Sequence, residues 1–552
     1  MSQEKLFVIG IGGTGMRCLE AFTHLCAIGM FDNQEIEVLT LDTDQLNGNK
    51  TKTENLIELY SRIKTSVSGA QGGTPNANTF FSAKLNLHRF WTNYSGSARA
   101  NYRSLSHLSE GSPEKQRSNK LISDLFLEKN SVQEFNLAHG YRAQTHLGSH
   151  LMYHAIVESA RNLAAGKNTD KQDKELELFM NKLNDAGKLG ARVFVFGSIF
   201  GGTGASSIPV IPKAFQDFIR IRSGGNSTID FSKIKFGSTL LTEYFTFKKP
   251  DKVQMSTKDD SVIADSSFFA LNSQAALQFY QNDPTVQKTY KTMYHIGWPI
   301  ESKKIGDEKE TSTITGGEKQ KNPCHITEML CACAAYDFLT KTKGFDVEKA
   351  DYLYKAIEFK DNTFNISFND FVGNENKAGD IFKNRLGAFF SLAHIVLSIN
   401  EAAFSTDPRA GMRAFIKRLN DQKIQSYDTI SDEECAEINE YFRQFAYSAD
   451  GERFYTGWIY QVRSTVAPGS FLFDSKAFTT DMKELRKLDI GQLFTEKNNW
   501  WPDGGTFSNR FNKFIQTLID VKYEDGQKVN TTKEQFMAHI FNAITKSQNI
   551  IN

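Results

Sequence analysis

The chain has 552 residues, of which 40% are hydrophobic and 23% are charged, a composition typical of a globular protein with two or three domains. Its 65 basic and 64 acidic side chains nearly cancel, which excludes an overall electrostatic attraction to nucleic acid or to an anionic membrane. No segment approaches the roughly 20 apolar residues that a membrane-spanning helix needs, and the N-terminal residues do not lead into a signal peptide.

The number and spacing of the cysteines indicate the redox state of the cellular compartment. The six cysteines are too sparse for a disulfide scaffold and form no paired Cys-x-x-Cys pattern of the kind that binds zinc. They are Cys18, Cys26, Cys324, Cys331, Cys333 and Cys435. This usage favours reduced thiols, and we therefore expect a cytoplasmic protein.

The first residues predict a strand, a glycine turn and a helix. The apolar run Leu6–Ile9 is typical of a short strand, and apolar residues recur at helical spacing after the glycine-rich stretch Gly10–Gly15. A second predicted strand, Ile36–Leu41, ends at Asp42-Thr43-Asp44. This β-α-β order implies a parallel sheet whose ligands bind at the carboxyl ends of the strands.

A second glycine-rich loop follows the apolar run Val193–Phe196. Gly201-Gly202-Thr203-Gly204 lies between this predicted strand and a helix predicted at 204–220. Glycines let backbone N–H groups turn toward an anion without interference from Cβ, while Thr203 adds a hydroxyl and the helix adds its positive N-terminus. The loop therefore predicts a phosphate-binding site.

The remaining pattern predicts more of the sheet and then a helical region. Strands are expected at 235–242 and 293–296, and a helix is expected at 151–163. A helix at 328–339 is apolar nearly all round, as expected of a helix buried between two domains. Later segments are amphipathic helices at 381–400, 408–420, 432–447 and 533–546, with one strand-like run at Trp458–Val462.

The order of these loops resembles that of the nucleotide site in the tubulin/FtsZ superfamily. Gly201–Gly204 followed by Pro209-Val210 is similar to the family's signature loop, and Gly10–Gly15 resembles its first phosphate loop. Asp42-Thr43-Asp44 resembles the FtsZ segment Asn-Thr-Asp, whose acidic end lies near the phosphates and the metal. Gly140–Gly148 resembles a further glycine-rich loop, in which Arg142 adds positive charge.

Two departures accompany the resemblance. Thr242–Lys248 resembles an FtsZ segment that ends in a ribose-contacting acid, but this chain has Lys248 there, with Asp251 as a substitute acid. Phe364–Phe371 matches the family's Asn-x-Asp-x-x-Asp loop at Asn365 and Asp370 and departs from it at Ser367.

The loop with Asn365 and Asp370 implies a catalytic role. In the family it enters the nucleotide site of the next subunit in a head-to-tail filament, where its acid orients the attacking water. Phosphoryl transfer depends mainly on positioning and electrostatic stabilisation, so the resemblance implies hydrolysis coupled to assembly. Glu328 is a backup acid, and Asn322, just before the apolar helix, is a candidate for reading the base.

The resemblance thus implies a cytoskeletal GTPase that binds GTP or GDP with Mg²⁺ and associates with itself head to tail. The implied ligand-binding residues are Gly10, Gly12, Gly13, Thr14, Gly15, Asp42, Asp44, Arg142, Gly201, Gly202, Thr203, Gly204 and Asn322, with Asp44 beside the metal. The implied fold class is α/β, with a tubulin/FtsZ-like nucleotide-binding domain at 1–345 that contains a parallel sheet and a central buried helix. A second, activation-type domain at 346–475 carries the catalytic loop, and a helical extension covers 476–552, which makes the C-terminal region helix-rich α+β.

Two alternatives stay open. The departures at Ser367 and Lys248 favour a nucleotide-dependent switch or scaffold that dimerises or engages a cognate protein partner without forming filaments. An NAD(P)-dependent Rossmann oxidoreductase would also use one Gly-x-Gly-x-x-Gly turn, with Asp42 as its ribose acid, although that fold does not require a second glycine loop.

Overall fold

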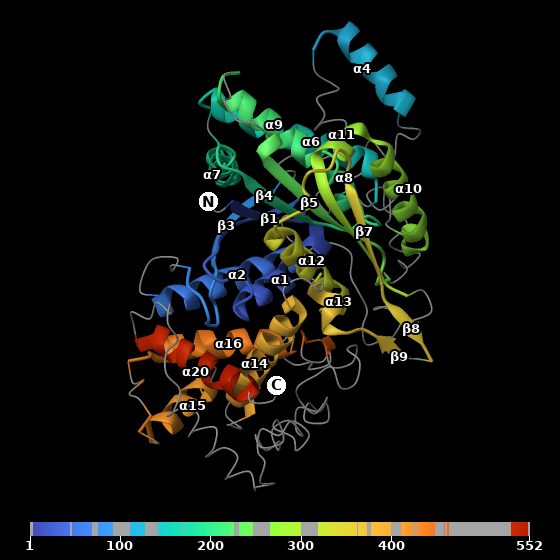
Figure 1. Ribbon diagram of the computed structural model, residues 1–552. Helices are drawn as coiled ribbons and strands as arrows, with labels where there is room; N and C mark the ends of the chain where they lie inside the picture. The colour runs from blue at the N-terminus through green and yellow to red at the C-terminus, as the bar shows by residue number, and fades with distance from the viewer. Residues whose placement is uncertain are drawn as a thin grey trace, which may run out of the picture.

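Seven parallel strands form one sheet in the order β3-β2-β1-β4-β5-β6-β7 (Figure 1). The strands are β1 (Lys5–Ile11), β2 (Glu35–Asp42), β3 (Lys84–Trp91), β4 (Ala191–Phe196), β5 (Ile234–Leu241), β6 (Tyr290–Gly297) and β7 (Asp351–Ala356). A separate antiparallel pair consists of β8 (Glu358–Lys360) and β9 (Thr363–Asn365). The expected α/β class with a parallel sheet is confirmed.

This computed structural model describes most of the chain up to residue 447 and shorter parts beyond it. The described residues are 4–44, 47–68, 75–91, 111–126, 141, 143–167, 169–225, 231–246, 265–299, 318, 320–361, 363–372, 377–398, 410–421, 423–424, 427, 429–447, 457–458, 461–462 and 532–549. The predicted site residues Arg142, Lys248 and Asp251 lie outside them.

Helices cover both faces of the sheet, and each face has its own apolar core. One face carries α1 (Gly12–Ala27), α2 (Gly48–Ser68) and α12 (Ile326–Thr340). The other carries α6 (Thr145–Ala164), α7 (Lys171–Ala186), α8 (Thr203–Ser207), α9 (Ile211–Arg222), α10 (Phe269–Asn282) and α11 (Pro284–Thr289). Short 3₁₀ turns span Phe231–Lys233 and Ser266–Phe268.

The C-terminal helices form a further layer below α1, α2 and α12 (Figure 1). They are α13 (Phe368–Val372), α14 (Ala378–Ser398), α15 (Ala410–Asp421), α16 (Asp432–Tyr447) and α20 (Thr532–Asn549). Helix α12 is therefore buried along most of its length, as its apolar sequence predicts. The sheet itself continues to Ala356, past residue 345, where the first domain was expected to end.

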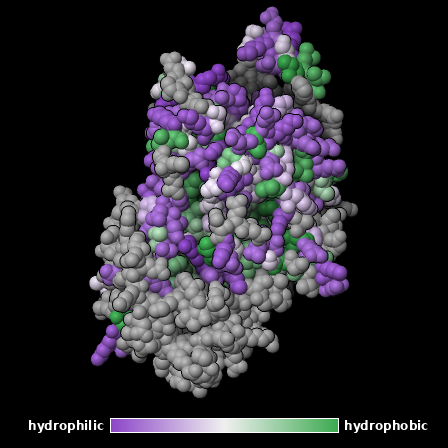
Figure 2. Space-filling view, in the orientation of Figure 1, coloured by the Kyte–Doolittle hydropathy of each residue, from purple (hydrophilic) through white to green (hydrophobic). Residues whose placement is uncertain are grey.

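Helix α4 (Pro113–Phe126) lies at the periphery of the molecule (Figure 1). Its Leu121, Ile122 and Leu125 are exposed, and they give the hydrophobic patch at the top of the space-filling view (Figure 2). Among the described residues no helix is both long and apolar enough to cross a bilayer.

Two predicted elements differ in the structure. The strand predicted at Trp458–Val462 is wrong, because Trp458, Gln461 and Val462 are helical and the Gln461 N–H donates to the Gly457 carbonyl at 3.1 Å. Trp458 and Val462 are both fully buried, so packing at helical i, i+4 spacing outweighs their strand propensity. The helix predicted at 204–220 divides into α8 and α9, since Pro209 and Pro212 have no N–H to donate to a continuous helix.

His24 connects α1 to the C-terminal layer. Its Nδ1 lies 3.0 Å from the Tyr441 hydroxyl, and its ring packs against Phe445 with centroids 5.0 Å apart. The imidazole is fully buried, and burial lowers the pKa of His24 to about 3, although the nearby Glu20 charge opposes the shift. The folded protein therefore holds this histidine neutral where an unfolded chain would protonate it.

We predict that His24 contributes to acid sensitivity. Below pH 6.5 the unfolded chain gains a proton at His24 that the folded protein does not accept, so the free energy of unfolding falls as the pH falls. When the pH falls from 7.5 to 5, the free energy of unfolding should fall by about 2 kcal/mol more in the wild type than in the His24→Gln variant. Urea denaturation at both pH values measures this change. The partly exposed His154 supplies the control variant His154→Gln, and a His24→Gln difference that stays constant with pH would contradict the prediction.

Candidate functional site

The two predicted glycine loops lie against each other at the carboxyl edge of the sheet. Strands β1 and β4 are parallel neighbours, so the loops that follow them leave from the same edge. A Cβ built on Gly12 would lie 3.1 Å from Cβ of Thr203. Gly12 also has φ +65°, a left-handed conformation that favours glycine. The structure thus brings together the N-terminus of α1 and the loop before α8.

Some of the predicted glycines are needed for packing. A Cβ on Gly15 would lie 2.5 Å from the Phe196 carbonyl oxygen, and one on Gly204 would lie 2.6 Å from the Ser198 carbonyl oxygen. Gly10 lies against the Gly15 backbone, with 3.2 Å from its Cβ position to the Gly15 carbonyl oxygen. These three glycines let the first turns of α1 and α8 approach the strands closely.

Gly13 and Gly201 have a different environment. Among the described residues a Cβ on Gly201 would meet only Ser198 Oγ, at 3.4 Å, and the atoms nearest to a Cβ on Gly13 are the side-chain ends of Asn47 and Gln320, at 3.3 to 3.4 Å. Gly13, Thr14, Gly201, Gly202 and Thr203 are all partly exposed, whereas Gly12, Gly15 and Gly204 are buried. The backbone at Gly13 and Gly201 is therefore the part of the two loops that a ligand can approach.

The described part of the third predicted loop, Tyr141 and Ala143–Gly148, also reaches this edge. The Cβ position of Gly202 lies 2.8 Å from the Ala143 backbone nitrogen, and Ser149 Oγ donates to the Ser206 carbonyl at 2.8 Å. Helix α6 begins there at Thr145, and neither α6 nor α1 has a side-chain cap at its N-terminus. The first-turn N–H groups of both helices thus carry positive partial charge at the site.

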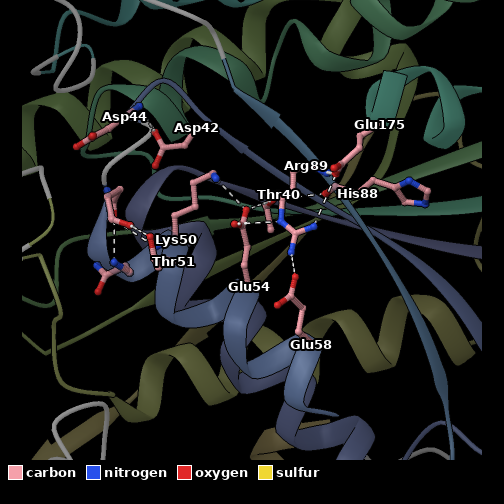
Figure 3. Close-up of polar contacts among 12 residues, drawn as sticks. Thr40, Asp42, Asp44, Lys50, Thr51, Glu54, Glu58, His88, Arg89 and Glu175 are labelled. Carbon is pink, nitrogen blue, oxygen red and sulfur yellow. Dashed lines mark hydrogen bonds and ion pairs between the residues drawn. The ribbon is translucent and has the colours of Figure 1, made fainter. Parts of the chain in front are cut away.

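The acidic loop after β2 lies beside the first glycine loop, because β1 and β2 are parallel neighbours and Asn47 Nδ2 lies 3.3 Å from the Cβ position of Gly13. Figure 3 shows Asp42 and Asp44 of this loop. Asp42 Oδ1 accepts the N–H groups of Thr43 at 2.7 Å and Asp44 at 3.3 Å. Its Oδ2 and the Thr43 hydroxyl are buried, and the described residues supply no hydrogen-bond partner for either. Burial, followed by the charge of Asp44, raises the pKa of Asp42 to about 7. A cation bound here would stabilise the ionised form of Asp42.

These residues fit a magnesium ion held together with a phosphate. Mg²⁺ prefers oxygen ligands and is usually held by one or two carboxylates, with water and phosphate completing its coordination. In the described part of the chain no group of three or more His, Cys, Asp or Glu side chains could hold a metal alone. Asp44, with the orphaned oxygens of Asp42 and Thr43 beside it, supplies the carboxylate part of such a site.

Sequence reasoning missed three residues that complete the site. Asn47 Nδ2 donates to Gln320 Oε1 at 2.7 Å, and Asn49 Oδ1 accepts the Asn322 N–H at 2.9 Å. These bonds hold the segment before α12 over the β2–α2 loop, which places the predicted Asn322 at the site. Asn49 Nδ2 is buried, and no described residue accepts a hydrogen bond from it. The Asn-Gly-Asn run at 47–49 is a turn and cap signal, but it does not reveal a partner 273 positions away.

A second polar network lies to one side of the acidic loop (Figure 3). Lys50 Nζ pairs with Glu54 at 2.9 Å, and Arg89 on β3 pairs with the same carboxylate at 3.3 Å. Arg89 also contacts Glu58 and Glu175. These cations are therefore engaged by carboxylates, and in the part of the loop that the structure describes the backbone N–H groups remain the main donors for an anion.

Glu328, the backup acid, is engaged inside the protein. Its carboxylate accepts hydrogen bonds from Arg17 at 3.2 and 3.3 Å, from the Tyr244 hydroxyl at 2.6 Å and from the His325 N–H at 3.0 Å. Arg17 and Glu328 are almost inaccessible to solvent. Glu328 thus holds helices together and is not placed to orient a water.

Asn365 and Asp370 lie apart from the glycine loops. Asn365 ends β9, and Asp370 lies in the first turn of α13, where its Oδ2 accepts both the N–H and the hydroxyl of Ser367 at 2.8 and 2.9 Å. Its Oδ1 pairs with Lys355 of β7 at 2.6 Å. Ser367, where the chain departs from the family pattern, is therefore a capping partner of Asp370. No contact of the described residues joins Asp370 to the phosphate-type loops of its own subunit.

The fold and the site define a class. The chain is an α/β protein in which two glycine-rich strand-to-helix turns, an acidic loop and an asparagine-rich segment meet at the carboxyl edge of a parallel sheet. Comparisons of the chain with protein-family models, with curated proteins and with solved structures found no match.

Gly15, which packs against β4, and Gly13, which is partly exposed, should respond differently to substitution by alanine. Gly15→Ala should lower the free energy of unfolding by about 1–3 kcal/mol, because its Cβ would contact the Phe196 carbonyl. Gly13→Ala should leave stability unchanged or raise it by up to about 1 kcal/mol, because Gly13 lies in α1, where alanine favours the helix. Thermal denaturation of the two variants beside the wild type measures both effects, and equal destabilisation would contradict this division.

Proposed function

We propose that the protein binds a guanine nucleotide with Mg²⁺ at the carboxyl edge of its sheet, as a tubulin/FtsZ-like GTP-binding protein. The observation that carries the proposal is the contact between the α1 N-terminus and the Gly201–Gly204 loop, beside which Gly13 and Gly201 are both partly exposed. One phosphate chain can accept N–H groups from both loops. A single dinucleotide turn would not need the second loop.

Different residues of the site would bind the phosphates, the metal and the base. Gly13, Thr14, Gly201, Gly202 and Thr203 would bind the phosphates through backbone N–H groups and hydroxyls. Asp44 would lie near the metal, which supplies charge neutralisation for the phosphates when bound. The segment at 320–322, held over the acidic loop by Asn47 and Asn49, would read the base through Asn322.

Nucleotide binding gives the direct test. Titration calorimetry of the purified protein with GTP, ATP and NAD(H) in the presence of Mg²⁺ should show the tightest binding for GTP. Gly13→Ala and Gly201→Ala should each weaken that binding at least about ten-fold, equivalent to about 1.4 kcal/mol, while the protein stays folded. Ser223→Ala at the far end of α9 is the matched control. Wild-type protein that binds none of the three ligands, or glycine variants that bind GTP like the wild type, would refute the proposal.

An NAD(P)-dependent oxidoreductase is the alternative with structural support. The first six strands have the order 3-2-1-4-5-6 that Rossmann domains use, and Asp42 ends β2, where a ribose acid is expected. Against it, Asp42 is only 2% exposed and its Oδ1 accepts N–H groups of its own loop. Tighter binding of NAD(H) than of GTP in the same titration would favour this alternative.

We further propose head-to-tail self-association, with Asn365 and Asp370 completing the site of a neighbouring subunit. The support is the separation of Asp370 from the glycine loops of its own subunit, together with its partial exposure, since its side chain is 33% accessible. Lys355 and Ser367 hold the carboxylate ionised: the pKa of Asp370 lies below its ordinary value because these hydrogen bonds outweigh burial. A carboxylate fixed in this way can orient a solvent water beside the nucleotide of another subunit.

Asp370→Ala tests the trans role. We expect GTP hydrolysis to fall at least ten-fold at protein concentrations where the wild type assembles, whereas GTP binding should be unchanged. Sedimentation and electron microscopy with a slowly hydrolysed GTP analogue should show filaments for both proteins. Lys355→Ala, which removes the ion pair but keeps the acid, is the matched control and should retain most hydrolysis. Wild-type protein that stays monomeric with the analogue would refute the proposed self-association but not the proposed nucleotide binding.

A further inference from the structure

Helix α10 has an exposed face with an unusual composition. Between Asp265 and Asp283 the chain has no charged residue and no histidine, although 23% of the whole chain is charged. Phe268, Leu271 and Phe279 are nevertheless 54%, 60% and 53% exposed. Large exposed apolar side chains on a surface depleted of charge are typical of the core of a protein interface.

The opposite face of α10 accounts for its position. Phe269 and Tyr280 are buried, and the Tyr280 hydroxyl donates to the Ala205 carbonyl just after the second glycine loop. Asn272 Nδ2 donates to the Phe200 carbonyl at 3.2 Å, and the Phe200 and Phe269 rings lie 4.9 Å apart. The helix is thus fixed along the loop that carries Gly201, and its exposed face points away from the sheet.

The pattern on this face fits a second copy of the same helix. In a two-fold interface each copy presents the same surface, so a charged face would repel itself and an uncharged one does not. Leu271 and Phe279 lie four positions on either side of Ala275. An antiparallel pair of helices centred on Ala275 therefore places Leu271 of one copy against Phe279 of the other, with the small alanines facing each other at the axis.

We propose that α10 is the contact of a two-fold homodimer, centred on Ala275 and formed by the Phe268, Leu271 and Phe279 face. A helix of this length spans roughly 21 Å, so the contact is small and the dimer is a weak, reversible one. Because Phe200 joins α10 to the Gly201 loop, a ligand at that loop changes the strength of the dimer. The effect of a ligand on the dimer rests on the proposed nucleotide site, whereas the dimer itself does not.

The test is analytical ultracentrifugation of the full chain over a range of concentrations, without nucleotide and then with a slowly hydrolysed GTP analogue and Mg²⁺. Leu271→Glu should raise the dimer dissociation constant at least ten-fold. Leu178→Glu on α7, where the leucine is similarly exposed at 56%, is the matched control and should leave the constant unchanged. Wild-type protein that remains monomeric in both conditions, or Leu271→Glu protein that associates like the wild type, would overturn the proposal.

A charge exchange tests the geometry independently of any effect on folding. Leu271→Lys and Phe279→Glu should each weaken self-association alone, and mixing the two variants should restore it, because the lysine of one copy then faces the glutamate of the other. Within one helix these positions are roughly 12 Å apart, so they do not pair with each other. Failure of the mixture to associate would exclude the Ala275-centred arrangement. Dimerisation without any GTP binding would refute the proposed function and leave this interface standing.

Discussion

A buried ion pair between Arg17 and Glu328 connects the two helices on which the site depends. Arg17 lies on α1, directly after the glycine turn, and Glu328 lies in the first turn of α12. Glu20 and Lys52 join the pair, so two cations and two carboxylates balance inside the protein. Burial raises the pKa of Glu20, but the Arg17 and Lys52 charges outweigh it and hold that pKa at about 2. Removing one member of such a group leaves an uncompensated buried charge, which typically costs about 3–5 kcal/mol.

This constraint explains why the edge of the sheet is pre-formed. Helix α1 is fixed at one end by the Gly15 contact with β4 and two residues later by Arg17, so its N-terminal N–H groups keep their direction. The Tyr244 hydroxyl binds the same Glu328 carboxylate, which extends the constraint to the loop after β5. The anion that we propose for this edge would therefore meet donors that do not need to be ordered first, and preorganised donors stabilise charge more effectively than flexible ones.

The sequence predicts local structure here better than long-range structure. Strands β1, β2 and β4 are recognisable because buried parallel strands are apolar and end in glycine or acidic turns, and α12 is recognisable because it is apolar all round. Strand β3 is not recognisable, since Arg89 and His88 interrupt its pattern and are stabilised by carboxylates from α2, α7 and β2. The contact of Gln320 with Asn47 is equally invisible, because each residue alone is an ordinary polar loop residue. The strand predicted at Trp458–Val462 fails because an apolar run of five residues fits a strand or one face of a helix equally well.

Phe200 is the point at which the glycine site and the surface of the molecule meet. It lies four residues after the end of β4, is buried among Tyr244, Phe245 and Phe269, and precedes Gly201. Any displacement of the Gly201 backbone has to move this ring or the rings around it, since a close-packed aromatic cluster has little free volume. The N-terminus of α10 belongs to that cluster, whereas the C-terminal half of α10 is held by the Tyr280 bond to Ala205. The helix is thus attached at two points to the segment that carries the second glycine loop, so the position of α10 is coupled to that of the loop.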